Sequence, residues 1–115
     1  MTVTIWHNPR CSKSRQTLAL LQEKGIEPEI VEYLKTPPDA DTIKATLKKL
    51  GLKPRDLLRK GEAAYKEHGL ADPSVSDDAI VAAMVASPVL IERPVVIRGN
   101  RAAIGRPPEA VLDIL

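Results

Sequence analysis

The sequence is poor in cysteine and in aromatic residues, and each shortage excludes a class of function. Its 115 residues include one cysteine, no phenylalanine, one tryptophan and two tyrosines. A single cysteine cannot form an internal disulfide, so the chain carries no Cys-x-x-Cys redox pair. One cysteine and two histidines make no recognisable zinc ligand set. Three aromatic residues also make a poor platform for stacking nucleic-acid bases.

A strong net charge and a long hydrophobic run are absent as well. The net charge is +2, which is too small to indicate nucleic-acid binding. The most apolar stretch, residues 79–91, contains Ser87 and Pro88 and is too short to span a membrane. Residues 1–6 are too few for the hydrophobic region of a signal peptide. Together with the lone cysteine, these features predict one soluble domain in a reducing cytoplasm.

The one cysteine, Cys11, lies where an apolar strand is expected to give way to a helix. Arg10, Lys13 and Arg15 lie within four residues of it, and no acidic residue does. Unpaired backbone N–H groups at a helix N-terminus and nearby cations lower the pKa of a cysteine, to roughly 3.5–7.5. Because the thiolate is the nucleophilic form, this segment predicts a reactive thiol. A small buried structural cysteine is the alternative.

Hydrophobic patterning predicts a βαβ unit, then a block of helices, then a ββα unit. The expected elements are strands at 3–6 and 29–33, helices at 11–24, 41–50 and 76–86, short helical turns at 54–59 and 62–67, a hairpin at 94–104 and a closing helix at 107–115. Gly25 is expected to stop the first helix, Ser76 to begin the third, and Gly99-Asn100 to form the hairpin turn. A strand, a helix and a strand within about thirty residues favour a parallel pair with a right-handed crossover. The expected architecture is α/β, a small mixed sheet covered by helices.

A thiolate in this segment is open to several kinds of chemistry. Arg15 lies one helical turn after Cys11, so its guanidinium can lie beside the sulfur. His7 can orient the loop, or it can simply be satisfied by a backbone carbonyl. A phosphatase loop needs an arginine six residues after the cysteine, and Thr17 occupies that position. A positive pocket around a thiolate attracts oxyanions, but spacing alone does not select which other arginines belong to it.

The motif His7-x3-Cys11-x3-Arg15, with Asn8-Pro9 between, resembles the active-site motif of the glutaredoxin-coupled arsenate reductases. The resemblance continues in three further segments, which are Leu57-Leu58-Arg59-Lys60, Ile91-Glu92-Arg93-Pro94-Val95-Val96, and Arg106-Pro107 with Glu109-Ala110-Val111-Leu112-Asp113-Ile114-Leu115. It therefore covers essentially the whole chain in the same order. It implies a thioredoxin-like fold in a single domain over residues 1–115, with a helical insertion at about 39–88.

The resemblance also assigns roles to individual residues. The implied site consists of Cys11 as the nucleophile, Arg59, Arg93 and Arg106 as the ligands of the oxyanion, and His7, Ser14 and Arg15 as supports of the nucleophile loop. The bond between Arg93 and Pro94 is implied to be the cis-proline junction of thioredoxin-like folds, next to the thiol. Only about 5–6% of X-Pro bonds in folded proteins are cis, so the residues alone do not predict it.

The implied reaction is the reduction of arsenate to arsenite. The Cys11 thiolate attacks arsenic and expels water, and arginines stabilise the charge of the covalent arseno-cysteine adduct. Because the chain has no second cysteine, glutathione is implied as a co-substrate that attacks this adduct, and glutaredoxin then releases arsenite. We expect no bound cofactor and no metal. The implied partners are arsenate or a similar oxyanion, glutathione and glutaredoxin, with no nucleic acid or membrane, for a cytoplasmic monomer.

The sequence departs from the plasmid-type members of this family in two respects. Ser12-Lys13-Ser14 follow the cysteine where those enzymes resemble Gly-Thr-Ser, and the chain stops after the closing helix, as in a short form without their C-terminal extension. Two alternatives of the same fold stay open, a glutathione-dependent thiol reductase and a non-catalytic regulatory protein that docks on a partner. Regulators of this fold sense redox through a Cys-x-x-Cys pair, and Ser14 stands in place of the second cysteine.

Overall fold

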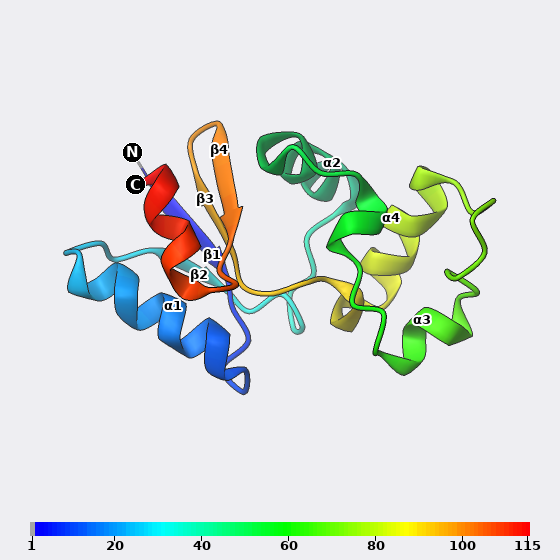
Figure 1. Cartoon of the computed structure of the whole chain (residues 1–115), viewed down its shortest axis with the longest axis horizontal. Coiled ribbons are helices and arrows are strands. Elements are labelled where there is room, and N and C mark those ends of the chain that lie inside the picture. The colour runs from blue at the N-terminus through cyan, green and yellow to red at the C-terminus, as the bar shows by residue number, and fades with distance from the viewer. Residues whose placement is uncertain (1) are drawn as a thin grey trace. The chain divides into compact units, whose positions relative to one another are not determined.

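A computed structural model describes residues 2–115, which divide into two compact units (Figure 1). Unit 1 combines residues 2–36 with Arg93–Leu115, and unit 2 is the continuous segment Pro37–Glu92. The sheet belongs to unit 1, whereas unit 2 is built from helices. Each unit is described by itself.

Unit 1 contains a four-stranded mixed sheet. Its strands are β1 (Val3–Trp6), β2 (Glu29–Val31), β3 (Val95–Arg98) and β4 (Arg101–Ile104), in the order β2-β1-β3-β4. β1 is parallel to β2, with Ile5 opposite Ile30, and antiparallel to β3. The β3–β4 hairpin turns at Gly99, whose φ of 60° suits glycine. The parallel pair and the hairpin confirm the mixed sheet that the sequence predicts.

Strand β2 is shorter than predicted and ends at Val31 instead of Tyr33. It lies at the edge of the sheet, and a turn follows directly. In this turn the N–H groups of Lys35 and Thr36 both donate to the carbonyl of Glu32, at 2.9 and 3.0 Å. Tyr33 is fully buried although it lies outside the strand. The apolar signal at this position therefore reflects burial in the turn and not pairing in the sheet.

Two helices cover one face of the sheet. Helix α1 (Ser12–Glu23) follows β1, and the 3₁₀ helix η3 (Pro108–Ile114) closes the chain. Val3 and Ile5, which point to the same face of β1, lie in one hydrophobic cluster with Leu21 of α1 and with residues of β3 and η3. After α1 the chain reverses at Gly25 with a φ of 74°, as predicted for a helix stop.

Unit 2 is a small helical unit. It consists of α2 (Ala40–Leu50), the 3₁₀ turn η1 (Pro54–Leu57), α3 (Ala63–Glu67), α4 (Asp77–Ala86) and the 3₁₀ turn η2 (Pro88–Leu90). The Asp39 carboxylate accepts from the N–H of Thr42 and caps α2, and the Ser76 hydroxyl accepts from the N–H of Ala79 and caps α4. Every helix within residues 2–115 is too short or too polar to cross a membrane.

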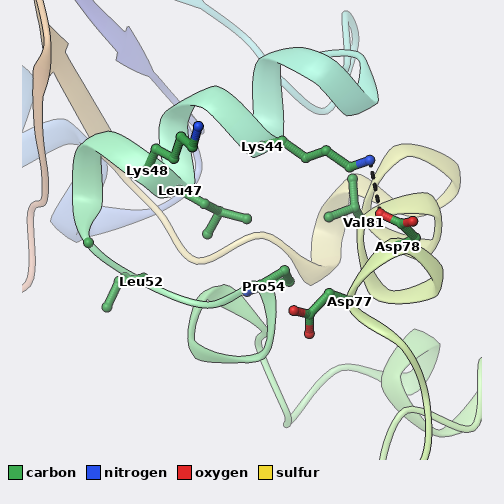
Figure 2. Close-up of a pocket in the computed structure, with 9 residues that line it drawn as sticks. Lys44, Leu47, Lys48, Leu52, Pro54, Asp77, Asp78 and Val81 are labelled. Carbon is green, nitrogen blue, oxygen red and sulfur yellow. Dashed lines mark ion pairs between the residues drawn. The ribbon is translucent and has the colours of Figure 1, made fainter.

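A hollow of about 330 Å³ lies within unit 2, between α2, η1 and the first turn of α4 (Figure 2). Leu47 and Val81 contribute apolar surface to it. Lys44 of α2 and Asp78 of α4 form an ion pair at 2.9 Å beside it. Its lining residues include no thiol. The cysteine singled out by the sequence, Cys11, belongs to unit 1.

Candidate active site

The loop between β1 and α1 presents Cys11 at the start of the helix. The backbone N–H of Cys11 donates to the Asn8 carbonyl at 3.0 Å, and the N–H of Arg10 donates to the Asn8 side-chain oxygen at 3.0 Å. Cys11 itself has an extended backbone, with φ −93° and ψ 122°, and occupies the N-cap position of α1. The first N–H groups of a helix have no partner within the helix, so they are available to an anion at this position.

These surroundings lower the pKa of the Cys11 thiol below its ordinary value. Burial alone raises this pKa, because burial disfavours the charged thiolate. The backbone N–H of Ser14, the guanidinium of Arg93 and the backbone N–H of Lys13 favour the thiolate, and together they outweigh burial. The thiol is partly exposed, so a reagent can reach it. Cys11 therefore has the properties of a nucleophile.

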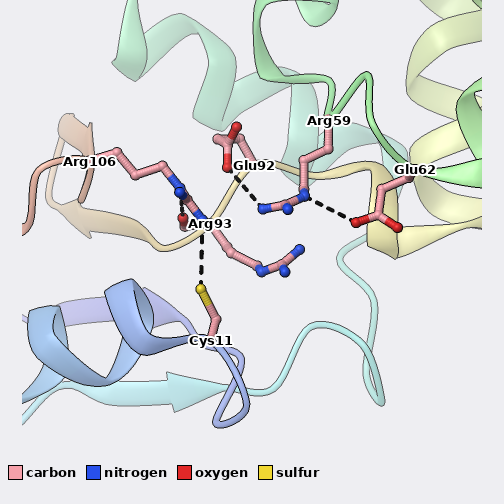
Figure 3. A network of polar contacts seen from close by, with 6 residues as sticks. All are labelled: Cys11, Arg59, Glu62, Glu92, Arg93 and Arg106. Atoms are coloured by element: carbon pink, nitrogen blue, oxygen red, sulfur yellow. Dashed lines mark hydrogen bonds and ion pairs between the residues drawn. The ribbon is translucent and has the colours of Figure 1, made fainter.

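Two arginines of unit 1 lie at this sulfur. The Arg106 Nη2 donates to the Cys11 Sγ at 3.6 Å, and the Arg106 Nε donates to the Arg93 carbonyl at 2.7 Å (Figure 3). Burial lowers the pKa of the Arg93 guanidinium, whereas its interactions with Cys11 and Tyr33 raise it. The interactions outweigh burial, so the pKa lies above the ordinary value. Both guanidinium groups are thus cations next to the thiolate.

Both of these arginines precede a cis-proline. The Arg93–Pro94 bond is cis, as the resemblance implies, and the Arg106–Pro107 bond is cis as well, which sequence reasoning did not anticipate. The two segments are joined by the hydrogen bond from Arg106 to Arg93 and by another from the Gly105 N–H to the Pro94 carbonyl at 2.9 Å. These two hydrogen bonds therefore hold the segments of Arg93 and Arg106 next to each other.

Gly105 is a residue of this arrangement that sequence reasoning missed. A Cβ atom at this position would lie 2.5 Å from the Thr17 Oγ1 and 2.8 Å from the Pro94 Cγ. Real Cβ atoms do not approach other atoms so closely, so only glycine fits here without displacement of its neighbours. The sequence signal is weak, because a single glycine between a strand and Arg106-Pro107 is an ordinary turn signal.

His7 and Ser14 form a buried pair behind the loop. The His7 Nδ1 and the Ser14 Oγ lie 2.5 Å apart, and the N–H of Asn8 donates to the same hydroxyl at 3.0 Å. Burial lowers the pKa of His7, the charge of Glu32 raises it and the charge of Arg15 lowers it, with a net decrease. The imidazole is therefore mainly neutral at pH 7. With Asn8 donating to the Ser14 oxygen, the Ser14 hydroxyl can donate to the His7 Nδ1.

Arg15 contacts the loop at its turn. Its position one turn after Cys11 allows a guanidinium beside the sulfur, and the resemblance implies a support of the nucleophile loop. In the structure the Arg15 Nη1 donates to the Pro9 carbonyl at 2.9 Å, and the cation that lowers the pKa of Cys11 is Arg93. Arg15 therefore fastens the turn that carries the thiol.

The third predicted oxyanion ligand, Arg59, belongs to unit 2. Its Nε lies 3.3 Å from the Glu62 Oε1, and its Nη1 lies 3.2 Å from the Glu92 Oε1 (Figure 3). Arg93 and Arg106 are thus grouped with Cys11 in unit 1, and Arg59 is grouped with two glutamates in unit 2. Among residues 2–115, no group of three or more His, Cys, Asp or Glu side chains is placed to hold a metal ion.

Comparison with known proteins identifies the family. Residues 6–114 match the ArsC family. The chain is 56% identical over 114 residues to a protein of Escherichia coli K12 named uncharacterized protein YfgD, with 98% of this chain and 96% of that protein covered. It is 46% identical over 114 residues to a protein named arsenate reductase from Neisseria meningitidis serogroup A, with 98% and 97% covered.

Solved structures give the same result for the fold. The structure named arsenate reductase from Vibrio cholerae is 51% identical and has a TM-score of 0.97, with 100% of this chain and 98% of that chain covered. The chain therefore belongs to the ArsC family and has its thioredoxin-like fold.

Proposed function

We propose that this protein is an arsenate reductase that reduces arsenate to arsenite through the Cys11 thiolate. The observation that carries the proposal is a thiol with a lowered pKa next to two arginines, with the Arg106 Nη2 3.6 Å from the Cys11 Sγ. Relatives named arsenate reductase, at 46% identity over nearly the whole chain, support the choice of substrate.

In the first step of the proposed reaction, the Cys11 thiolate attacks the arsenic of arsenate. An S–As bond forms, an As–O bond breaks, and the departing oxygen leaves as water after taking up protons. We propose that Arg93 and Arg106, which lie next to the Cys11 sulfur, stabilise the charged oxygens of the adduct. On the resemblance we propose Arg59 as a third ligand of the oxyanion, and His7, Ser14 and Arg15 as supports of the nucleophile loop.

The second half of the reaction needs thiols from outside the chain. Reduction of arsenic from the +5 to the +3 state takes two electrons, which two thiols supply when they are oxidised to a disulfide. Cys11 is the single thiol of the sequence, so it cannot complete this step with a partner of its own. We propose that the thiol of glutathione, as co-substrate, binds the arsenic of the adduct and displaces one oxygen as water. A glutaredoxin thiol then attacks the glutathione sulfur, so that the S–As bond to glutathione breaks, a mixed disulfide leaves and arsenic gains two electrons; water then breaks the Cys11–arsenic bond and releases arsenite.

The test is arsenite formation from arsenate by the purified protein with glutathione and glutaredoxin. Cys11→Ser is expected to abolish it, and Arg93→Ala and Arg106→Ala are expected to reduce it strongly. Arg101→Ala is the matched control, because Arg101 is an exposed arginine of unit 1 that donates to the Asp113 carbonyl. No arsenite from the wild-type protein, or full activity of Cys11→Ser, would overturn the proposal.

A mixed-disulfide substrate separates this proposal from a general thiol reductase of the same fold. The same variants are assayed with a glutathione mixed disulfide in place of arsenate. We expect arsenate to be the better substrate, because the two guanidinium groups at the sulfur suit a compact multiply charged oxyanion. Faster turnover of the disulfide than of arsenate would contradict the proposal.

A further inference from the structure

Arg59 is already bound by two carboxylates of its own unit. Its Nε and Nη1 lie 3.3 Å from Glu62 and 3.2 Å from Glu92, respectively. The two carboxylates of this cluster therefore already occupy guanidinium donors of Arg59. This arrangement is unexpected around an arginine whose proposed partner is an anion, because a carboxylate and an oxyanion repel each other.

The backbone fixes this cluster. Leu58 and Ile91 form an isolated antiparallel bridge, and both side chains are buried. On either side of the bridge, the Arg59 N–H donates to the Leu90 carbonyl at 2.7 Å, and the Glu92 N–H donates to the Leu57 carbonyl at 2.8 Å. Arg59 and Glu92 are therefore carried by the same short ladder, and their contact does not depend on mobile loops.

The ion pairs are also partly shielded from water. The exposed fractions of the Arg59, Glu62 and Glu92 side chains are 24%, 32% and 28%. Fully exposed ion pairs are strongly screened and contribute little, whereas partly buried charges interact more strongly. A carboxylate and an oxyanion bind the same fork of guanidinium N–H donors, so they are alternative ligands of Arg59.

We propose that Glu62 and Glu92 are internal competitors of the substrate oxyanion for Arg59. The oxyanion binds Arg59 by displacing a carboxylate, and the two glutamates thereby lower the affinity of the protein for its substrate. This inference rests on the proposed function, in which Arg59 is a ligand of the oxyanion. Glu62 and Glu92 thus set the affinity of the protein for oxyanions, and neither takes part in bond making.

Neutral isosteres test the inference. Glu62→Gln and Glu92→Gln keep the shape and one acceptor oxygen but remove the negative charge. We expect each to lower the KM for arsenate by about threefold to tenfold, since each removes one of the two negative charges that compete for Arg59. The inhibition constant of phosphate, a competing oxyanion, is expected to fall in parallel. Glu67→Gln is the charge-matched control, because Glu67 is an exposed glutamate of unit 2 and outside these ion pairs.

A second background separates competition from a global change in charge. In Arg59→Ala protein, Glu92→Gln is expected to lower the KM by less than it does in the wild-type background, because the contested cation is gone. An unchanged or raised KM of both Glu→Gln variants in the wild-type background overturns the inference, and a raised KM indicates that the glutamates only position Arg59. These results leave the proposed function intact, whereas absence of turnover by the wild type overturns the function. Calorimetric titration with phosphate tests the competition without turnover.

Discussion

Replacing Gly105 by alanine adds one methyl group where unit 1 has no room for it. The new Cβ would lie 2.5 Å from the Thr17 Oγ1, 2.8 Å from the Pro94 Cγ and 3.1 Å from the Thr17 Cγ2. Neither neighbour can move aside easily. Thr17 is fully buried in α1, and its hydroxyl donates to the Lys13 carbonyl at 2.8 Å. Pro94 is a rigid ring whose carbonyl is bound by Gly105 itself.

The expected loss of stability follows from this overpacking. An extra methyl group in a well-packed interior costs about 1–3 kcal/mol. For a chain of this size, 1 kcal/mol shifts the melting temperature by about 4 °C, so we expect Tm to fall by about 4–12 °C. Displacement of the segment also moves Arg106, which follows Gly105 directly, so arsenate reduction is expected to fall as well.

Thermal unfolding followed by circular dichroism measures this effect. Gly61→Ala is the control, because a Cβ at Gly61 meets no atom within 4 Å, and its Tm is expected to stay within about 2 °C of the wild type. The Thr17→Ala substitution removes two of the three closest contacts, so Gly105→Ala is expected to cost less in that background. A Tm of Gly105→Ala equal to that of the wild type would refute the packing argument, and an equal loss in the Thr17→Ala background would refute the part assigned to Thr17.

Four further predictions concern the thiol loop and one helix cap. Arg93→Ala is expected to raise the pKa of Cys11, because a cation that favours the thiolate is lost; the pH dependence of thiol alkylation measures this, and an unchanged pKa contradicts it. Ser14→Ala is expected to destabilise the fold by about 1–3 kcal/mol in urea unfolding, since it leaves buried partners without their hydrogen bonds. Because the pKa of His7 is lowered in the folded protein, the unfolded chain binds a proton at His7 more tightly, and the free energy of unfolding is expected to fall as the pH drops through 6.5. His7→Gln is expected to weaken this pH dependence, which urea unfolding across that pH range measures. Ser76→Ala is expected to cost about 1 kcal/mol in the same assay, because it removes the N-cap of α4.

Short stretches of sequence predict those features of the fold that depend only on neighbouring residues. The helix stop at Gly25, the N-cap at Ser76 and the hairpin turn at Gly99 each depend on a few adjacent residues, and the structure confirms all three. Strand β2 is the exception, because Tyr33 extends the apolar pattern of the strand but is buried in the turn that follows it. The order of elements therefore follows from the sequence more reliably than the ends of each element.

The grouping of the site residues depends on distant parts of the chain. Arg106 contacts Cys11 across 95 positions, and Arg59 contacts Glu92 across 33. No local pattern distinguishes these arginines from Arg101, so spacing alone did not select them, and only the resemblance did. The crowding around Gly105 is equally invisible in the sequence, because it arises where α1 and the segment of Pro94 meet.

The assembly of unit 1 from the two ends of the chain has a consequence for when the thiol becomes reactive. Strand β1 pairs with β3, whose residues follow the whole of unit 2 in the sequence. Such distant pairing forms late, since a long loop must close first. Until Arg93 has been synthesised and docked, Cys11 lacks the guanidinium that lowers its pKa, and only the N–H groups of Ser14 and Lys13 favour the thiolate. The rate of Cys11 alkylation therefore also reports whether the two ends of the chain have assembled into unit 1.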